Sequence, residues 1–230
     1  MKNLLIVGAS SGIGKTVAEL ASKEDFNIFT ASRQPCEVEG VTHQTLDVTE
    51  DNLDLDFLPD TLEGLVYCPG TINLKPFHRL KISDFEQDLA INTMGAIKVL
   101  QAAYPKLKKA EGASVVLYST VAVQLGMNFH ASIATAKAAL EGLGKSVASE
   151  WSAHQIRVNM IAPSLTDTPL ADKILSSDDR KEASNKRHPL GRYGQPEDLA
   201  EMTLFLLSDK SSWMTGQTLG IDGGMGTLKP

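Results

Sequence analysis

The glycines near the start of the chain have the spacing of a phosphate-binding loop. The run LLIVGASSGIGKTVAEL places Gly8, Gly12 and Gly14 directly after an apolar strand and at the start of a helical pattern. Glycine permits a tight turn and a close backbone approach, and free N–H groups at a helix N-terminus stabilise a pyrophosphate. A nucleoside triphosphate loop, GxxxxGK followed by Ser or Thr, would need glycine where the chain has Ala9. The pattern therefore favours a dinucleotide, and a glycine turn without a ligand is the alternative.

A second group of candidate residues lies in the alanine-rich stretch HASIATAKAALEGL, residues 130–143. Lys137 is the charge near its middle, and Ile133 lies one turn earlier on the same helix face. His130 lies one turn before Ile133, and histidine commonly titrates near neutral pH. Both His130 and Lys137 are therefore candidates for proton transfer. A solvent-facing histidine at the helix start and a surface lysine are the plain alternatives.

Short apolar runs alternate with helical patterns along the chain. Because most of these runs are apolar throughout, they fit strands buried on both faces of a parallel sheet. The predicted strands are 3–7, 26–31, 64–68, 114–119, 156–161 and 217–221. Helices are expected to begin near Gly12, Ser83, His130 and Pro196, with SDFE at 83–86 forming a capping box. The alternation predicts one doubly wound α/β domain over residues 1–230.

The composition argues against several functional classes. The 230-residue chain is 42% hydrophobic and has a net charge of −6, so no binding to nucleic acid is expected. No apolar run has the length of a signal peptide or a membrane span. Cys36 and Cys68 form no CxxC motif and fit free thiols of a reducing cytoplasm. The five histidines lack metal-ligand spacing, so no metal site is expected.

Seven motifs in order resemble those of the short-chain dehydrogenase/reductase family, over residues 3–224. The glycine loop is the first, LDVT carries Asp47, and YCPG ends in Gly70 where the family usually has Asn-Asn-Ala-Gly. INTMGA and VNMIAPSLTDTPL follow, and then the C-terminal PLGRYGQPEDLAEMTLFLLSD and TGQTLGIDGG. The resemblance implies a single Rossmann-type domain with about seven parallel strands in the order 3-2-1-4-5-6-7. It also implies a small carbonyl substrate, and a homodimer or homotetramer packed through helices near 85–108 and 130–150.

The end of the second strand indicates which nicotinamide nucleotide is preferred. An acidic residue there would repel a 2′-phosphate, but this chain has Ser32 and Arg33. A guanidinium pairs well with phosphate, and Lys15 adds positive charge, so NADP(H) is expected in preference to NAD(H). A solvated Arg33 without a ligand is the alternative. The residues expected to bind the cofactor are Gly8, Ser10, Ser11, Gly12, Ile13, Gly14, Ser32, Arg33, Asp47, Val48, Gly70, Lys137, Pro163 and Thr168.

The resemblance implies a catalytic set from which one member is missing. In the family a tyrosine precedes the lysine by four residues and a serine precedes the tyrosine by thirteen; these positions hold Ile133 and Thr120 here. Asn92 matches the family's helix asparagine. The tyrosine protonates the carbonyl oxygen as hydride reaches the carbon, the lysine lowers the tyrosine pKa, and the serine orients the carbonyl. Threonine keeps the hydroxyl, whereas isoleucine transfers no proton.

Three functions remain open from the sequence. Losing a general acid costs about 10²–10⁴ in rate, so a reductase with Lys137, through a water, or His130 as substitute donor is the first. A nucleotide-binding scaffold or sensor without redox activity is the second, and a non-redox lyase or isomerase on the same fold is the third. Residues 164–190 are expected to form a mobile substrate lid. The segments 33–41 and 47–70 are too short for the usual helices after strands two and three, so the adenine end is expected to be open.

Overall fold

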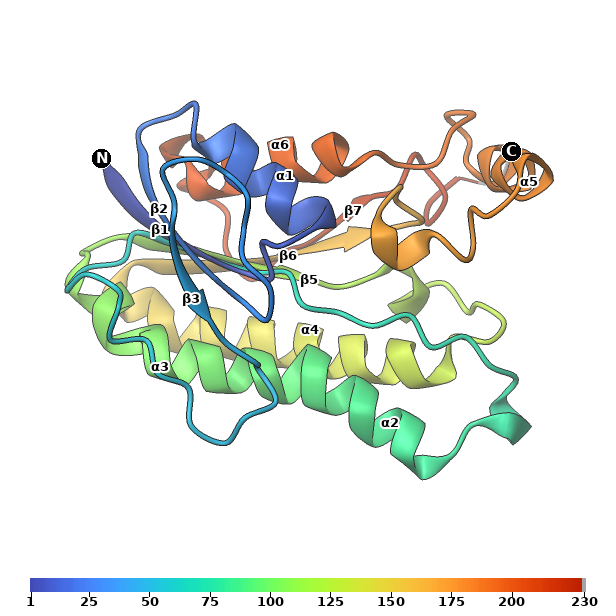
Figure 1. Cartoon of the computed structure of the whole chain (residues 1–230), viewed down its shortest axis with the longest axis horizontal. Coiled ribbons are helices and arrows are strands. Elements are labelled where there is room, and N and C mark those ends of the chain that lie inside the picture. The colour runs from blue at the N-terminus through green and yellow to red at the C-terminus, as the bar shows by residue number, and fades with distance from the viewer. Residues whose placement is uncertain (229–230) are drawn as a thin grey trace.

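One seven-stranded parallel sheet forms the centre of the molecule, with helices on both faces (Figure 1). The computed structural model describes residues 1–228. Its strands are β1 (Lys2–Val7), β2 (Phe26–Ser32), β3 (Thr42–Thr45), β4 (Gly64–Tyr67), β5 (Ala113–Tyr118), β6 (Ile156–Pro163) and β7 (Thr218–Ile221). Their order is β3-β2-β1-β4-β5-β6-β7, and every neighbouring pair is parallel. The predicted fold and strand order are confirmed.

The strand register brings the predicted site to one edge of the sheet. Val7 of β1 is level with Tyr67 of β4, and Tyr67 is level with Leu117 of β5. The residues that follow these strands therefore meet at the carboxyl edge, where doubly wound folds bind their ligands. The glycine loop, the Cys68–Gly70 turn and Thr120 all leave the sheet here.

Two hydrophobic cores explain why the strand sequences are apolar throughout. Helices α1 (Gly12–Ala21) and α6 (Pro196–Leu207) cover one face, and α2 (Ile82–Leu89), α3 (Gly95–Lys109) and α4 (Ala131–Trp151) cover the other (Figure 1). Alternate side chains of a strand point to opposite faces. In β1, Leu4 and Ile6 pack in the core of α1 and α6, whereas Leu5 and Val7 pack in that of α3 and α4. Each face thus buries half of every central strand.

The predicted capping box at 83–86 is wrong, because the helix begins earlier. α2 starts at Ile82, and the backbone N–H of Lys81 donates to the carboxylate of Asp84 at 2.9 Å. That carboxylate also accepts from the Lys75 ammonium at 2.7 Å. Ser83 therefore lies inside the first turn. The helix continues through a π-helical turn, Ala90–Met94, into α3.

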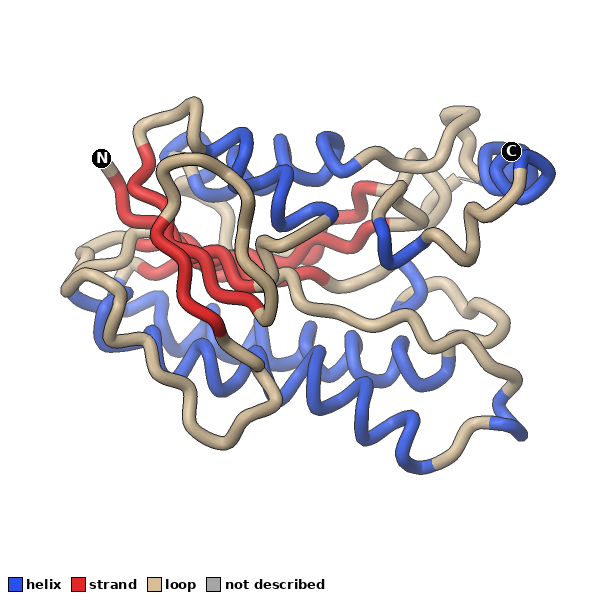
Figure 2. Tube along the Cα trace, viewed as in Figure 1, coloured by secondary structure: helices blue, strands red, loops and turns tan. Residues whose placement is uncertain are grey.

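No helix is described after β2 or β3, in agreement with the short lengths of these connections. Residues 33–41 and 46–63 run as loops and turns, seen as tan tube on either side of β3 (Figure 2). The loops still fill the cores: Cys36 packs beside α1, and Leu55, Leu58 and Leu62 pack on the α3 face. The adenine end of the sheet is therefore bounded by loop segments.

The segment 164–190 contains a helix that the sequence patterns did not predict. A short 3-10 turn, Pro169–Ala171, precedes α5 (Asp178–Arg187), which lies off the end of the sheet toward which the strands point (Figure 1). The Ser177 hydroxyl accepts from the backbone N–H of Arg180 at 3.3 Å and caps this helix. Within residues 1–228, every helix is either too short or too polar to cross a membrane.

Candidate active site

A cleft of about 1130 Å³ opens at the carboxyl edge of the sheet. It is walled by the glycine loop, the segments after β2, β3 and β4, the first turns of α4, and the segment after β6. The structure brings together in it these predicted residues: Gly8, Ser10, Ser11, Gly12, Ile13, Gly14, Ser32, Arg33, Asp47, Val48, Gly70, Thr120, His130, Ile133, Lys137, Pro163 and Thr168. Asn92 is fully buried and lies outside the set of residues lining the cleft.

The glycine loop has the shape that a pyrophosphate needs. Gly8 and Gly12 have φ angles of 85° and 55°, in the region that favours glycine. A Cβ on Gly14 would lie 2.3 Å from the carbonyl oxygen of Gly8, so the loop and the helix touch backbone to backbone. Ser11 precedes α1 without a side-chain cap. The N–H groups of the first turn are therefore free to bind an anion, and the cradle fits a dinucleotide.

Replacing Gly14 by alanine should reduce nucleotide affinity at least tenfold and lower the melting temperature. The methyl group would force the helix away from Gly8, which displaces the N–H groups that face the phosphates. Titration of NADPH fluorescence and thermal denaturation would measure the two effects. Gly142→Ala is the matched control, because a Cβ there meets nothing within 4 Å. Unchanged NADPH affinity in Gly14→Ala would exclude this loop as the phosphate site.

The adenosine end of the cleft carries an arginine that forms no ion pair within 4.0 Å among the described residues. Arg33 is exposed and lines the cleft, whereas Ser32 is buried and donates to the carbonyl of Gln34 at 2.7 Å. The carboxylate of Asp47 accepts from the backbone and hydroxyl of Thr49, which lowers its pKa. Lys15 lies outside the cleft lining, and its ammonium is 3.5 Å from the Glu37 carboxylate. Arg33, rather than Lys15, is therefore the cation that lines this end of the cleft.

Lys137 is the only lysine among the buried residues of the described chain, and its amine reaches the floor of the cleft. The side chain is 6% exposed, and its ammonium donates to the backbone carbonyl of Tyr118 at 2.6 Å. Burial lowers the pKa of Lys137 to about 8, although the nearby Cys68 and Asp88 act in the opposite direction. The amine can therefore gain or lose a proton close to physiological pH, as a group in acid–base catalysis must.

Thr120 and Ile133 face the cleft beside this lysine. The Thr120 oxygen accepts from the backbone N–H of Ala122 at 3.3 Å, which leaves its own proton free for a carbonyl oxygen. Ile133 is 6% exposed and presents only aliphatic carbon to the cleft. Tyr118 does not replace the missing tyrosine, because its hydroxyl points to α6 and bonds with Thr203 at 2.5 Å. A proton donor in this cleft would therefore have to be another side chain.

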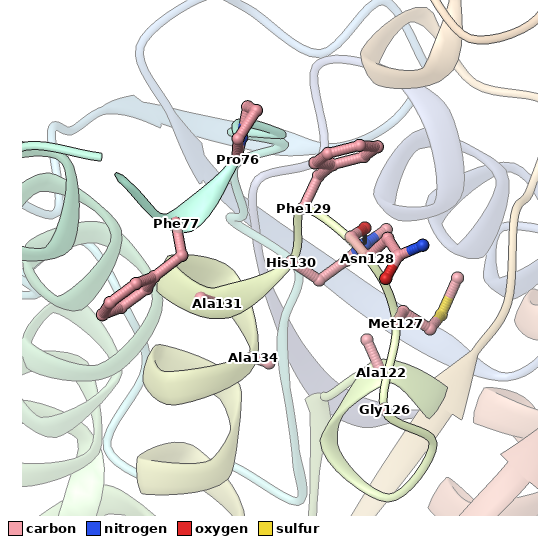
Figure 3. Close-up of a pocket in the computed structure, with 10 residues that line it drawn as sticks. All are labelled: Pro76, Phe77, Ala122, Gly126, Met127, Asn128, Phe129, His130, Ala131 and Ala134. Atoms are coloured by element: carbon pink, nitrogen blue, oxygen red, sulfur yellow. Dashed lines mark hydrogen bonds between the residues drawn. The ribbon is translucent and has the colours of Figure 1, made fainter. Parts of the chain in front are cut away.

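His130 lies at the junction of the cleft with a smaller cavity. Its Nδ1 is 2.7 Å from the carbonyl of Asn128, so Nδ1 carries a proton and Nε2 is uncommitted. The smaller cavity, about 480 Å³, is lined largely by apolar residues, among them Phe77 and Phe129, and shares His130 and Met127 with the cleft. Figure 3 shows Phe129 on the loop that precedes α4, and Phe77, which begins the 3-10 turn Phe77–Arg79, beside the first turn of α4. An apolar group attached to a substrate carbonyl could therefore extend past His130.

Behind the cleft wall, Asn92 belongs to a buried polar cluster that the sequence analysis missed. Its amide nitrogen donates to the Thr71 hydroxyl at 2.9 Å and to the Asp88 carbonyl at 2.7 Å. The Thr71 hydroxyl in turn donates to the Asp88 carboxylate at 2.5 Å. Asp88 is 1% exposed and lines the cleft. The signal was present, because Asp88 precedes Asn92 by four residues on one helical face.

A serine–histidine pair was also missed. The Ser164 hydroxyl lies 2.9 Å from His188 Nε2, and His188 Nδ1 donates to the Ser184 carbonyl at 2.7 Å. Ser164 follows β6, whereas His188 follows α5, so the pair joins the sheet edge to the expected lid. Both residues line the cleft. Nothing in their sequence spacing, 24 residues apart, indicates the contact.

Comparison with known proteins identifies the relatives of this chain. A family model described as enoyl-(acyl carrier protein) reductase matches residues 8–226. The 3-oxoacyl-acyl-carrier-protein reductase FabG of Thermotoga maritima is 32% identical, over 97% of each chain. A tropinone reductase homologue of Arabidopsis thaliana is 30% identical, over 96% of this chain and 88% of the relative. The crystal structure of the TT0495 protein from Thermus thermophilus superposes with a TM-score of 0.91, at 28% identity and 99% coverage of both chains.

The match spans the glycine loop, the cleft and the C-terminal strand, and the structural likeness covers nearly the whole chain. The first two relatives named above are described as a reductase and a reductase homologue, and the Thermus thermophilus protein shares the fold. The chain belongs to the short-chain dehydrogenase/reductase family.

Proposed function

We propose that this protein is an NADPH-dependent carbonyl reductase of the 3-oxoacyl type, in which Lys137 replaces the missing tyrosine as proton donor. The observation that carries the proposal is the buried amine at the floor of a cleft lined by a dinucleotide loop. Burying an ammonium with one backbone acceptor costs several kcal/mol. An amine in this position can contact a bound nucleotide, and with a pKa near 8 it can also give up a proton close to physiological pH.

The choice of NADPH is supported by Arg33 and by one structural relative. Arg33 lines the cleft at the adenosine end and has no carboxylate within 4.0 Å among the described residues. A guanidinium is suited to bind a 2′-phosphate through two parallel hydrogen bonds. The solved structure of ElxO with NADP bound is 25% identical and superposes with a TM-score of 0.87. Both observations favour the phosphorylated nucleotide.

Arg33→Ala should weaken NADPH binding about tenfold or more and leave NADH binding nearly unchanged. Loss of charge-assisted bonds to a phosphate accounts for the direction, and each 1.4 kcal/mol corresponds to a factor of ten. Fluorescence titration with both nucleotides measures the ratio. Lys15→Ala is the matched control, because that lysine pairs with Glu37 outside the cleft. Tenfold tighter binding of NADH than NADPH by the unmodified protein would reverse the assignment.

The chemistry follows from the groups that face the cleft. When bound, NADPH supplies the hydride that forms the new C–H bond at the carbonyl carbon. Thr120 donates a hydrogen bond that orients the carbonyl oxygen. The Lys137 ammonium gives up one proton to that oxygen, so an O–H bond forms as an N–H bond breaks, and the neutral amine regains a proton from solvent. Residues 164–190, with α5, would cover the substrate during this step.

The substrate class is tested by turnover. The named relatives point to acyl thioesters and ketones, so the panel contains 3-oxoacyl thioesters, enoyl thioesters and cyclic ketones. NADPH oxidation with the first or third class supports the proposal. Ile133 supports one competing function, a nucleotide-binding scaffold. Micromolar NADPH binding without oxidation across the whole panel would establish that function in place of the reductase.

A further inference from the structure

Two buried acceptor atoms beside the cleft have no hydrogen-bond partner within the described part of the chain. They are the Asp88 Oδ2 and the Asn92 Oδ1 atoms. Leaving a buried polar atom without a partner costs about 1–3 kcal/mol, and more for a charged one. The other Asp88 oxygen accepts from Thr71, so the carboxylate is held in a fixed orientation. The unpartnered oxygen therefore destabilises the fold, and an electrostatic function of the carboxylate would explain why it is present.

The amine of Lys137 and one of these acceptors, Asn92 Oδ1, both lie beside Gly70. A Cβ placed on Gly70 would be 3.4 Å from Asn92 Oδ1 and 3.7 Å from Lys137 Nζ, which are ordinary van der Waals distances. Lys137 uses one of its three N–H donors, for the Tyr118 carbonyl. A cation with spare donors therefore lies beside acceptors without partners.

Asp88 is the anion that acts on this cation. The groups that face Lys137 come from three elements: Cys68 after β4, Asp88 on α2 and the Tyr118 carbonyl on β5. Burial raises the pKa of the Cys68 thiol to about 12, so it is neutral at physiological pH. On α4 itself, the Glu141 carboxylate accepts from the Ser119 hydroxyl. The negative charge that favours the protonated amine is thus that of Asp88.

We propose that Asp88 is a positioning residue that keeps the proton on Lys137 in the buried cleft until the substrate oxygen takes it. The proposal rests on the proposed function, because it concerns the same proton donor. Asp88 touches neither the reacting atoms nor the ammonium directly; it acts through its charge across a medium of low polarity. The Thr71 hydroxyl donates to that carboxylate, and the Asn92 amide donates to Thr71 and to the backbone carbonyl of Asp88.

The test titrates Lys137 itself. In protein labelled with ¹³C at lysine Cε, the Lys137 signal is identified by its loss in Lys137→Met. Asp88→Asn should move the midpoint of this titration down by about one pH unit, a tenfold change in the protonation equilibrium. Glu86→Gln removes the same charge from an exposed position of α2 and should leave the midpoint unchanged. Asp88→Glu, which restores the charge, should return the midpoint toward that of the unmodified protein.

An Asp88→Asn midpoint within about 0.2 pH units of that of the unmodified protein would overturn the proposal. If that variant does not fold, as judged by circular dichroism, Asp88→Ser provides the same readout. The titration needs no turnover, so a protein that binds NADPH but reduces nothing can still confirm or overturn the role of Asp88. In an active enzyme, the alkaline limb of kcat/KM should shift in Asp88→Asn by the same amount as the titration.

Discussion

Lys137→Met should lower kcat/KM for carbonyl reduction by about 10²–10⁴, the usual contribution of a general acid. Methionine fills a similar volume but has no proton to give. Because burial lowers the lysine pKa to about 8, the reductase rate should be level below pH 8 and should fall above it as the amine loses its proton. The reverse reaction needs the neutral amine and should gain rate over the same range. Initial rates of NADPH oxidation from pH 6 to pH 10 measure the forward reaction, and initial rates of NADP⁺ reduction over the same range measure the reverse reaction.

Lys145→Met is the matched control for this variant, because Lys145 is an exposed lysine of the same helix. It should retain the full rate and the same pH profile. In Lys137→Arg the positive charge is kept, because a guanidinium does not release its proton near neutral pH. This variant should be nearly as slow as Lys137→Met, and its rate should not fall above pH 8. His130→Ala tests whether His130, the second candidate donor, supplies the proton instead of Lys137. If His130→Ala, and not Lys137→Met, removes the activity, the proton comes from the histidine.

Ile133→Tyr should raise kcat for the same substrate, by less than the roughly 10²–10⁴ that a general acid contributes in full, because Lys137 already supplies part of that contribution. The new phenol would lie one turn before Lys137 on the helix face that lines the cleft, where the ammonium would lower its pKa. Single-turnover measurements with NADPH present in excess report the chemical step directly. The alkaline limb should then belong to the phenol and lysine together.

Ile133→Phe distinguishes the hydroxyl from the ring, since it has the same ring and no proton. An equal gain in the phenylalanine variant would mean that cleft shape, and not proton transfer, limits the rate. An Ile133→Tyr variant with no gain would mean that the existing donor already serves the reaction fully, or that reduction is not the reaction catalysed.

Much of the architecture could be predicted from local patterns, because the central strands are buried on both faces and are therefore largely apolar. β1, β2 and β5 were located within one residue at each end. β3 gives no such run, because its sequence THQT lies at the edge of the sheet and is only partly buried. α5 was missed because DDRKEASNKR has no apolar face. Its ends are set instead by the Ser177 cap and by the chain returning through His188.

The cleft was predicted as a set of motifs, but its polar interior was not. Glycines at a strand end indicate a loop without reference to the rest of the chain, so Gly8, Gly12 and Gly14 could be located from sequence. The proposed role of Asp88 depends on its hydrogen bond with Thr71, which is 17 residues away, and on an amine that belongs to another helix. The pKa of Lys137 likewise depends on how deeply α4 buries it. Contacts of this kind arise from packing between elements, which residue spacing does not encode.

The helix-free connections after β2 and β3 also affect how the nucleotide is bound. Arg33 begins one of these connections and Asp47 lies in the other, so the adenosine half of the cleft is formed by segments without helical hydrogen bonds. Such segments open at a lower free-energy cost than the central strands do. Holding the adenosine end closed therefore carries an entropic cost, and part of the cofactor's binding free energy is used to order this half of the molecule.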